Sequence, residues 1–183
     1  ADEEHGFPSG TMMSLFATET HGMCDIVAGE TKSSKGASGI AQFMKPTAIA
    51  YGLRVDDEVD ERNDPAKAIP AAAEHLNDLR TYARNKGLPE RLQMDFAAAA
   101  YNTGEPNMDG WIAGGSLASE TKKYVGKVRH AQDLLRMAGV DLSAASSYPG
   151  QRAVTYSPSE TRLPSIPEYG SPAVLEAKLA ELE

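Results

Sequence analysis

Basic residues are scarce in this sequence. Lys and Arg number 18 against 26 Asp and Glu, which gives a formal net charge of −8 at pH 7. A nucleic-acid-binding segment needs a basic surface to displace counterions from phosphates, so this balance argues against one. It also argues against electrostatic capture by anionic membranes or cell walls. A polyanionic ligand would have to be held by shape and hydrogen bonds.

Cysteine and long apolar runs are scarce as well. Cys24 is the only cysteine, which excludes an internal disulfide, and we expect it to be a small buried hydrophobic residue. No stretch is long and apolar enough to span a bilayer. The start, ADEEHGFP, lacks the basic-then-apolar pattern of a secretory signal and has no initiator Met. We therefore expect either a chain that does not use that export route or, favoured by the missing Met, a processed piece.

Patterns for metal binding are missing too. The acidic run 56–64, DDEVDERND, has Glu61 where a calcium-binding EF-hand loop needs glycine, so a solvated acidic loop is expected. The four histidines are widely separated and form no HExxH motif, so no zinc site is predicted. Neither a metal ion nor another cofactor is expected.

The patterning that is present is helical, and no run of alternating β-branched residues predicts a strand. Pro70 is expected to kink the helix predicted over 64–86 or to split off its first turn. Apolar spacing and capping residues predict long helices over 8–22, 64–86, 89–104 and 119–137, and shorter helical turns within 40–52. In the last helix the positions expected to be buried are Tyr124, Val125, Val128, Leu134 and Leu135.

The composition changes near residue 142. Residues 143–172 contain five of the eleven prolines and many serines, which is typical of an extended linker or of an arm that wraps a partner. Residues 172–183, PAVLEAKLAELE, have the composition of one short amphipathic helix, too short to be stable alone. The sequence therefore predicts an all-α domain over 1–142 and a Pro/Ser-rich arm ending in a short helix over 143–183.

One helical stripe of the predicted domain carries a carboxylate. Glu19 lies at three- and four-residue spacing from Met12, Leu15 and Phe16 in the first helix. Loss of hydration and the nearby helix C-terminus both favour its protonated form, which a general acid needs. The alternative is a frayed helix end with Glu19 in water or paired with a lysine.

Two further segments place polar side chains beside small residues. Gln42 follows Gly36 and Gly39 in GASGIAQFMKPTAIAYG, and a third glycine, Gly52, ends this segment, so backbone could approach a ligand closely. Tyr101 and Asn102 end an alanine-rich helix and could reach into a cleft. Their structural alternatives are a glycine-rich turn before a core helix, and a buried Tyr beside a capping Asn.

Taken in order, these segments resemble a known family. TETHG, GASGIAQFMKPTA and AAAAYNTGE resemble the ES, GLMQ and AYNAG motifs of the lytic transglycosylase SLT domain, which is related to goose-type lysozyme. DPAKAIPAAAEHLNDL resembles the family's intervening helix, and ETKKYVGKV its late YV motif; the resemblance covers roughly residues 5–138. GLRVDDEVDERNDPAKAI is similar to transglycosylase domains of internal, ejected virion proteins of short-tailed phages.

The resemblance implies a lysozyme-like helical fold whose cleft binds peptidoglycan glycan strands. It implies that Glu19 is the single catalytic acid, which protonates the oxygen between N-acetylmuramic acid and N-acetylglucosamine. The same carboxylate would then deprotonate the muramic C6 hydroxyl, giving a 1,6-anhydro product. No obvious second carboxylate appears in the sequence, in keeping with this chemistry. Family positions that contact substrate or hold the acid are matched by Thr20, Gln42, Met44, Tyr101, Asn102 and Tyr124.

Two positions depart from the family pattern, and two other functions stay open. Thr20 replaces a serine, and Ala41 replaces a larger methionine, which is expected to reshape one subsite. A goose-type muramidase would hydrolyse the same bond, with Asp25 or Glu30 positioning water. A structural virion protein would keep the fold only for assembly.

The resemblance also implies partners and a location. Other virion proteins are expected to bind through the arm. The protein is expected in the virion and to act in the host periplasm during delivery of the phage genome, with the bacterial periplasm as the alternative.

Overall fold

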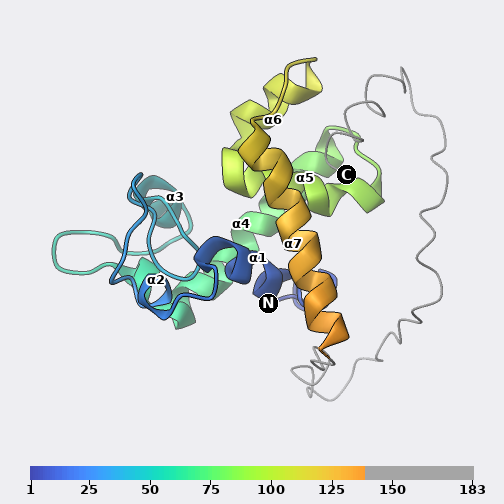
Figure 1. Cartoon of the computed structure of the whole chain (residues 1–183). Helices are drawn as coiled ribbons and strands as arrows, with labels where there is room; N and C mark the ends of the chain where they lie inside the picture. The colour runs from blue at the N-terminus through green and yellow to red at the C-terminus, as the bar shows by residue number, and fades with distance from the viewer. Residues whose placement is uncertain (139–183) are drawn as a thin grey trace.

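The computed structural model describes residues 1–138, and the regular secondary structure in that range is helical (Figure 1). No β-strand occurs among these residues, apart from isolated bridges pairing Ser38 with Phe43 and Val55 with Asp60. The all-α prediction is therefore confirmed. The elements are α1 (Thr11–Thr20), α2 (Cys24–Val27), α3 (Lys45–Ala50), the 3₁₀ helix η1 (Glu61–Asn63), α4 (Pro65–Asn85), α5 (Glu90–Thr103), α6 (Glu105–Ile112) and α7 (Ser119–Met137).

The long helices α1, α4, α5 and α7 form one packed body, and the short helices α2 and α3 lie to one side of it. Helix α4 packs along α5, and α7 packs against both α5 and α1. In Figure 1 helices α2 and α3 and the loops around them lie on the left, and α6 lies at the top. Helix α1 lies near the centre, between α2 and α7. Helix α1 thus brings its residues to the junction between the packed body and the side that carries α2 and α3.

Small side chains make up most of the buried positions of α4 and α5. Alanines are buried there beside the larger Leu76, Leu79 and Phe96, and small side chains allow two helices to pack closely. The buried alanines are Ala68, Ala71, Ala72, Ala73 and Ala83 in α4 and Ala97, Ala98, Ala99 and Ala100 in α5.

Capping chemistry accounts for where α4 begins. The Asp64 side chain accepts a hydrogen bond from the Ala66 N–H (3.0 Å), and Pro65 occupies the first helical position. Pro70 lies inside the helix, which nevertheless runs without interruption from Pro65 to Asn85. The predicted separation of a first turn is therefore wrong. Pro70 lies near the helix start and is exposed, so the single backbone bond it forgoes costs little packing.

The other long helices also match the prediction, while α2 and α6 were not predicted. Residues 105–112, EPNMDGWI, contain Pro106 and Gly110, which read as loop residues from sequence. Pro106 is compatible with a helix start, and Gly104, with φ of 85°, supplies the turn between α5 and α6.

Burial was predicted wrongly at two places. Leu134 is 51% exposed and Leu135 is only half-buried, because the last buried apolar residue of α7 is Val128 and its final turns are no longer covered. Cys24 is exposed, because it opens the short α2, in which no residue is fully buried. The predicted boundary at 142 and the predicted arm lie outside the described residues and stay predictions.

Candidate active site

Glu19 lies in the last turn of α1, on the stripe that the sequence predicted. Met12, Leu15 and Phe16 are 4%, 1% and 8% exposed, so this face of the helix is in the core. The helix ends at His21, an exposed residue in the left-handed conformation (φ 53°). Glu19 itself keeps some exposure, which a group that must reach a ligand requires.

Two opposing effects set the pKa of the Glu19 carboxyl. Burial raises the pKa of its carboxyl from an ordinary 4.5 to about 7, because the charged form loses hydration. The Tyr124 hydroxyl, from α7, donates a hydrogen bond to Glu19 Oε1, which favours the charged form and opposes that rise. The Glu19 carboxyl therefore gains and loses its proton near neutral pH, well above the range of an ordinary glutamate.

Tyr101 connects the same region to the loop before α3. Its hydroxyl donates a hydrogen bond to the carbonyl oxygen of Ala41 (2.8 Å). Burial, and secondly the nearby charge of Glu19, raise the pKa of this phenol well above its usual range. The burial of Tyr124 and its contact with Glu19 do the same to the pKa of that phenol. Both phenols therefore stay protonated donors beside the carboxyl.

Gln42 adopts a backbone conformation that is rare for a residue with a side chain. Its φ is 47°, and its Nε2 donates to the Gly39 carbonyl (2.8 Å). Ala41 beside it is completely buried, so its side chain faces the core. The expectation that Ala41 reshapes a subsite stays a prediction.

The three remaining predicted site residues differ in their surroundings. Thr20 is buried, and its hydroxyl donates to the Phe16 carbonyl (2.8 Å) and accepts from the Gly22 N–H (3.2 Å). Asn102 is exposed, and its Oδ1 accepts from the Thr121 hydroxyl (3.1 Å). Met44 is 41% exposed just before α3. As substrate contacts these residues stay predictions.

The two carboxylates considered for a hydrolytic mechanism lie in the segment after α1. Asp25 accepts a hydrogen bond from the Thr31 hydroxyl (2.8 Å), and Glu30 is exposed. Neither is among the causes of the raised pKa of Glu19, which are burial and Tyr124.

The sequence of this chain matches a known family model and a known phage protein. The sequence model described as the transglycosylase SLT domain matches residues 1–124, a range that includes Glu19, Gln42, Tyr101 and Tyr124. The chain belongs to the transglycosylase SLT domain family. The chain is also 38% identical over 104 residues to the peptidoglycan transglycosylase gp16 of Escherichia phage T7, an alignment that covers 51% of this chain and 7% of that protein. It therefore spans only a small part of the length of that relative.

The SLT domain also contains an aromatic cluster that sequence reasoning did not find. His75 of α4 has its ring centroid 4.8 Å from that of Tyr51 and 5.1 Å from that of Tyr101, and Phe43 lies 6.1 Å from Tyr101. Burial lowers the pKa of His75 to about 4, so its ring is neutral at neutral pH. The histidine was dismissed because it matched no metal motif, and only the fold brings it beside Tyr101.

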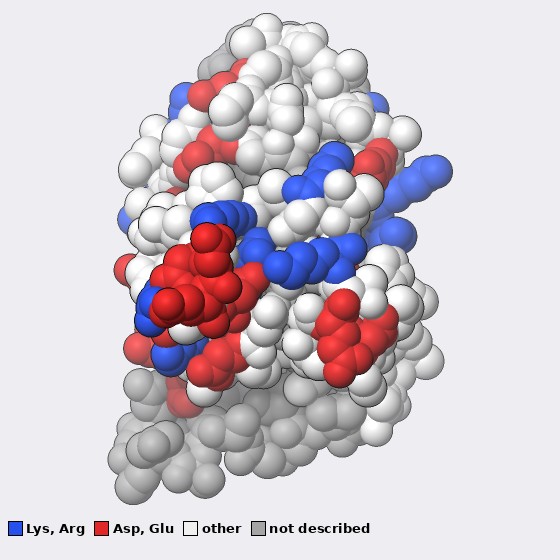
Figure 2. All heavy atoms as spheres, turned by 90° about the vertical axis from the view of Figure 1, so that its left-hand side faces the viewer, with Lys and Arg blue, Asp and Glu red and all other residues white. Residues whose placement is uncertain are grey.

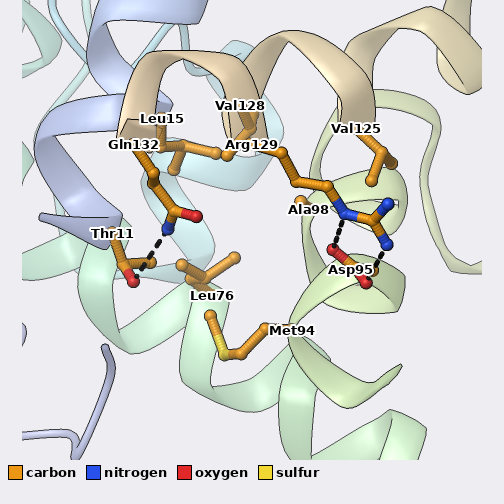
Figure 3. A pocket seen from close by; sticks show the side chains of 10 residues that line it. All are labelled: Thr11, Leu15, Leu76, Met94, Asp95, Ala98, Val125, Val128, Arg129 and Gln132. Carbon is orange, nitrogen blue, oxygen red and sulfur yellow. Dashed lines mark hydrogen bonds and ion pairs between the residues drawn. The ribbon is translucent and has the colours of Figure 1, made fainter. Parts of the chain in front are cut away.

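A pocket between α1, α4, α5 and α7 contains none of the predicted site residues (Figure 3). Two polar pairs cross it: Arg129 donates to both carboxylate oxygens of Asp95 (3.0 and 2.5 Å), and Gln132 donates to the Thr11 hydroxyl (3.4 Å). These contacts tie α7 to α5 and to α1. They therefore help to fix the distance between Tyr124 and Glu19.

Charges are grouped on the side of the SLT domain that carries α2 and α3. Figure 2 shows a compact acidic patch there, beside a band of Lys and Arg. In the acidic run, Asp56 and Glu58 pair with Arg54 (2.5 and 3.2 Å), and Glu61 pairs with Lys67. Within residues 1–138 no group of three or more His, Cys, Asp or Glu is placed to hold a metal ion, and no helix has the length and apolarity needed to cross a membrane.

Proposed function

We propose that this SLT domain cleaves the β-1,4 bond between N-acetylmuramic acid and N-acetylglucosamine without water. The observation that carries the proposal is the carboxyl of Glu19, partly exposed, hydrogen-bonded to Tyr124 and with a pKa of about 7. At that pKa one group can both release and take up a proton near neutral pH.

The reaction needs two proton transfers through Glu19. In the first, the protonated carboxyl gives its proton to the glycosidic oxygen, the bond from that oxygen to C1 breaks, and N-acetylglucosamine leaves as the alcohol. In the second, the carboxylate takes the proton of the muramic C6 hydroxyl, whose oxygen bonds to C1. The proton is returned to Glu19, and the product ends in 1,6-anhydro-muramic acid.

The phenols beside Glu19 have separate roles in this scheme. The Tyr124 hydroxyl donates to Oε1, which leaves Oε2 to carry the transferable proton. Tyr101 donates to the Ala41 carbonyl and holds the segment that carries Gln42 against α5. Gln42, Met44, Asn102 and Thr20 are proposed to bind the glycan strand or to support the residues that do.

The phage relative supports a proposal for the biological setting. Its name describes a peptidoglycan transglycosylase, and it is a phage protein. We propose that the present chain is likewise part of a virion protein that opens the cell wall locally, in the host periplasm, while the genome is delivered. Its binding to other virion proteins through residues 143–183 is part of the same proposal.

The muramidase and scaffold alternatives are less well supported. A muramidase needs a second carboxylate that positions water, but the Asp25 carboxylate accepts a hydrogen bond from the Thr31 hydroxyl (2.8 Å) and Glu30 is exposed. A scaffold does not need a carboxyl whose pKa is raised to about 7 by loss of hydration, since removing water from the charged form reduces stability.

The test is mass spectrometry of muropeptides released from purified cell walls. The unmodified chain should release products with anhydro-muramic ends, one water lighter than hydrolytic products, and cleavage should fall above pH 7 as Glu19 loses its proton. Glu19→Gln should release none while remaining folded. Asp25→Asn and Glu30→Gln are the matched controls and should cleave normally. Reducing-end products that disappear in either control would establish the muramidase, and no products from folded wild type would favour the scaffold.

A further inference from the structure

The segment that carries Gln42 rests on a buried arginine. Arg62 of η1 is only 4% exposed. Its Nη1 donates to the carbonyl oxygens of Gly36 (2.9 Å) and Phe43 (3.0 Å), which lie at the two ends of the segment 36–43. One guanidinium nitrogen therefore fixes the separation of both ends of this loop.

The guanidinium is in turn held by a carboxylate. Asp60 accepts from Nε of Arg62 (2.7 Å) and from Nη2 (2.6 Å), in the parallel geometry that only arginine offers. Lys32 approaches the same carboxylate at 3.1 Å. The buried charge is thus paired, and its remaining donor is directed at the loop.

The backbone of η1 lies in direct contact with the same loop. A Cβ atom on Gly39, where φ is 72°, would lie 1.8 Å from the Arg62 carbonyl oxygen, so only glycine fits there. The Ser38 hydroxyl donates to Asn63 Oδ1 (2.7 Å). The loop therefore cannot shift toward η1, and it is held from that side by several independent contacts.

This support acts next to a strained residue. Gln42 has a positive φ, a conformation that persists only when its surroundings fix it. The carbonyl of Phe43, the next residue, is fixed by Arg62, and the carbonyl of Ala41, the preceding residue, is fixed by Tyr101. The peptide group before Gln42 and the peptide group after Phe43 are thereby held in place, so the backbone is fixed on either side of the pair Gln42–Phe43.

We propose that Arg62, held by Asp60, is a positioning residue that keeps Gln42 in the conformation that binds the glycan strand. The inference rests on the proposed function, since it assumes that Gln42 contacts that strand. It gives a role to the run 56–64, which looks like a solvated acidic loop from sequence. Asp60 and Arg62 are the part of that run that faces inward, while Asp56 and Glu58 are its exposed part and pair with Arg54, which precedes the run.

The test is a double-mutant cycle between Arg62 and Gln42. Arg62→Lys keeps the charge but loses the fork, and it should lower kcat/KM on solubilised glycan strands by about tenfold, as small misplacements of binding groups do. In a Gln42→Ala background the same change should have little further effect, because Arg62 acts through Gln42. Arg54→Lys, at an exposed arginine just before the run, is the matched control and should cleave as wild type does.

Two readouts separate positioning from general loss of structure. The pH above which cleavage falls should be unchanged in Arg62→Lys, because the contact between Glu19 and Tyr124 is untouched. An equal loss in both backgrounds, a shifted pH limit, or wild-type cleavage by Arg62→Lys would overturn the inference. If Arg62→Lys fails to fold, Asp60→Asn, which leaves Arg62 in place, should show a smaller loss with the same dependence on Gln42, and an additive loss would overturn it.

A binding measurement distinguishes failure of the positioning role of Arg62 from failure of the proposed function. In the Glu19→Gln background, co-sedimentation with intact cell walls should weaken equally on adding Arg62→Lys or Gln42→Ala. If the unmodified chain cleaves nothing, the proposed function fails. If binding is nonetheless weakened by Gln42→Ala and not by Arg62→Lys, the positioning role fails independently.

Discussion

Glu19 is the residue at which burial and reactivity are most closely linked. The pKa of its carboxyl is about 7 because the folded chain removes much of its hydration, and 4.5 is its ordinary value. The folded state therefore binds this proton more tightly than the unfolded state does. The stability contributed by the group is fully present below pH 4.5 and is lost as the pH rises to 7 and above.

Replacing the ionisable carboxyl should therefore stabilise the protein in a pH-dependent way. Glu19→Gln should have nearly the wild-type free energy of unfolding at pH 4 and a higher one at pH 8, by up to about 3 kcal/mol for a shift of this size. Urea denaturation of both proteins at each pH measures the difference. Glu30→Gln, an exposed position, shows whether loss of one acidic side chain is stabilising by itself. A variant no more stable than wild type at pH 8 would contradict the raised pKa.

At the scale of elements, the start of α1 depends on a residue far from it in sequence. Gly10 precedes the helix and offers no side-chain cap. The carboxylate of Asp2 accepts hydrogen bonds from the Gly10 and Met12 N–H groups, both at 2.9 Å. Because the backbone donors at a helix start have no intrahelical partner, this carboxylate acts as a remote cap for the helix that carries Glu19.

Helix α4 holds this capping segment in place. The Arg80 guanidinium donates to the carbonyls of His5 (2.7 Å) and Gly6 (3.1 Å) and lies 5.0 Å from the centre of the Phe7 ring. Phe7 itself is buried. The position of α1 is therefore set from α4 as well as from α7.

Loss of the remote cap should weaken α1 measurably. Asp2→Ala should lower the free energy of unfolding by about 1 kcal/mol, the usual cost of removing a side-chain cap. Thermal or urea unfolding measures this. Glu4→Ala removes an exposed carboxylate from the same segment and should change stability much less. Equal effects of the two substitutions would show that charge, and not capping geometry, is responsible.

At the scale of the whole molecule, the candidate site is assembled from segments that are distant in sequence. Glu19 comes from α1, Gln42 from the loop before α3, Tyr101 from α5 and Tyr124 from α7. Long-range packing of α7 on α1 and α5, with the polar pairs in Figure 3, brings these segments together. All of these contacts lie within residues 1–138.

The catalytic unit should therefore not need the C-terminal part of the chain. A protein ending at residue 142 should keep its helical circular dichroism signal and its activity on isolated cell walls, while losing the proposed binding to virion proteins. Circular dichroism, muropeptide release and co-sedimentation with virion components measure the three properties. Unfolding of the shortened chain would show that residues 143–183 belong to the core and that the predicted boundary is wrong.

The sequence by itself determined the helical class, the extent of the long helices and the position of Glu19 on a buried stripe. These features depend on local rules: Asp64 and Pro65 begin a helix wherever they stand, and residues three and four apart share a helix face. Motif order also led to the family, because each motif is a short continuous run. Where local rules conflict, as with Pro106 and Gly110 in α6, the sequence alone was insufficient.

Only the tertiary structure decided which residues meet. The Tyr124 hydroxyl reaches Glu19 across 105 residues of sequence, and Arg62 reaches the Phe43 carbonyl across 19. No periodicity encodes such pairings, because they depend on how the helices pack. The same packing leaves Leu134 exposed, buries Ala41, and ties the Thr20 hydroxyl to its own helix. The pKa of Glu19 belongs to this level as well, since hydration is removed by neighbours that the chain supplies only when folded.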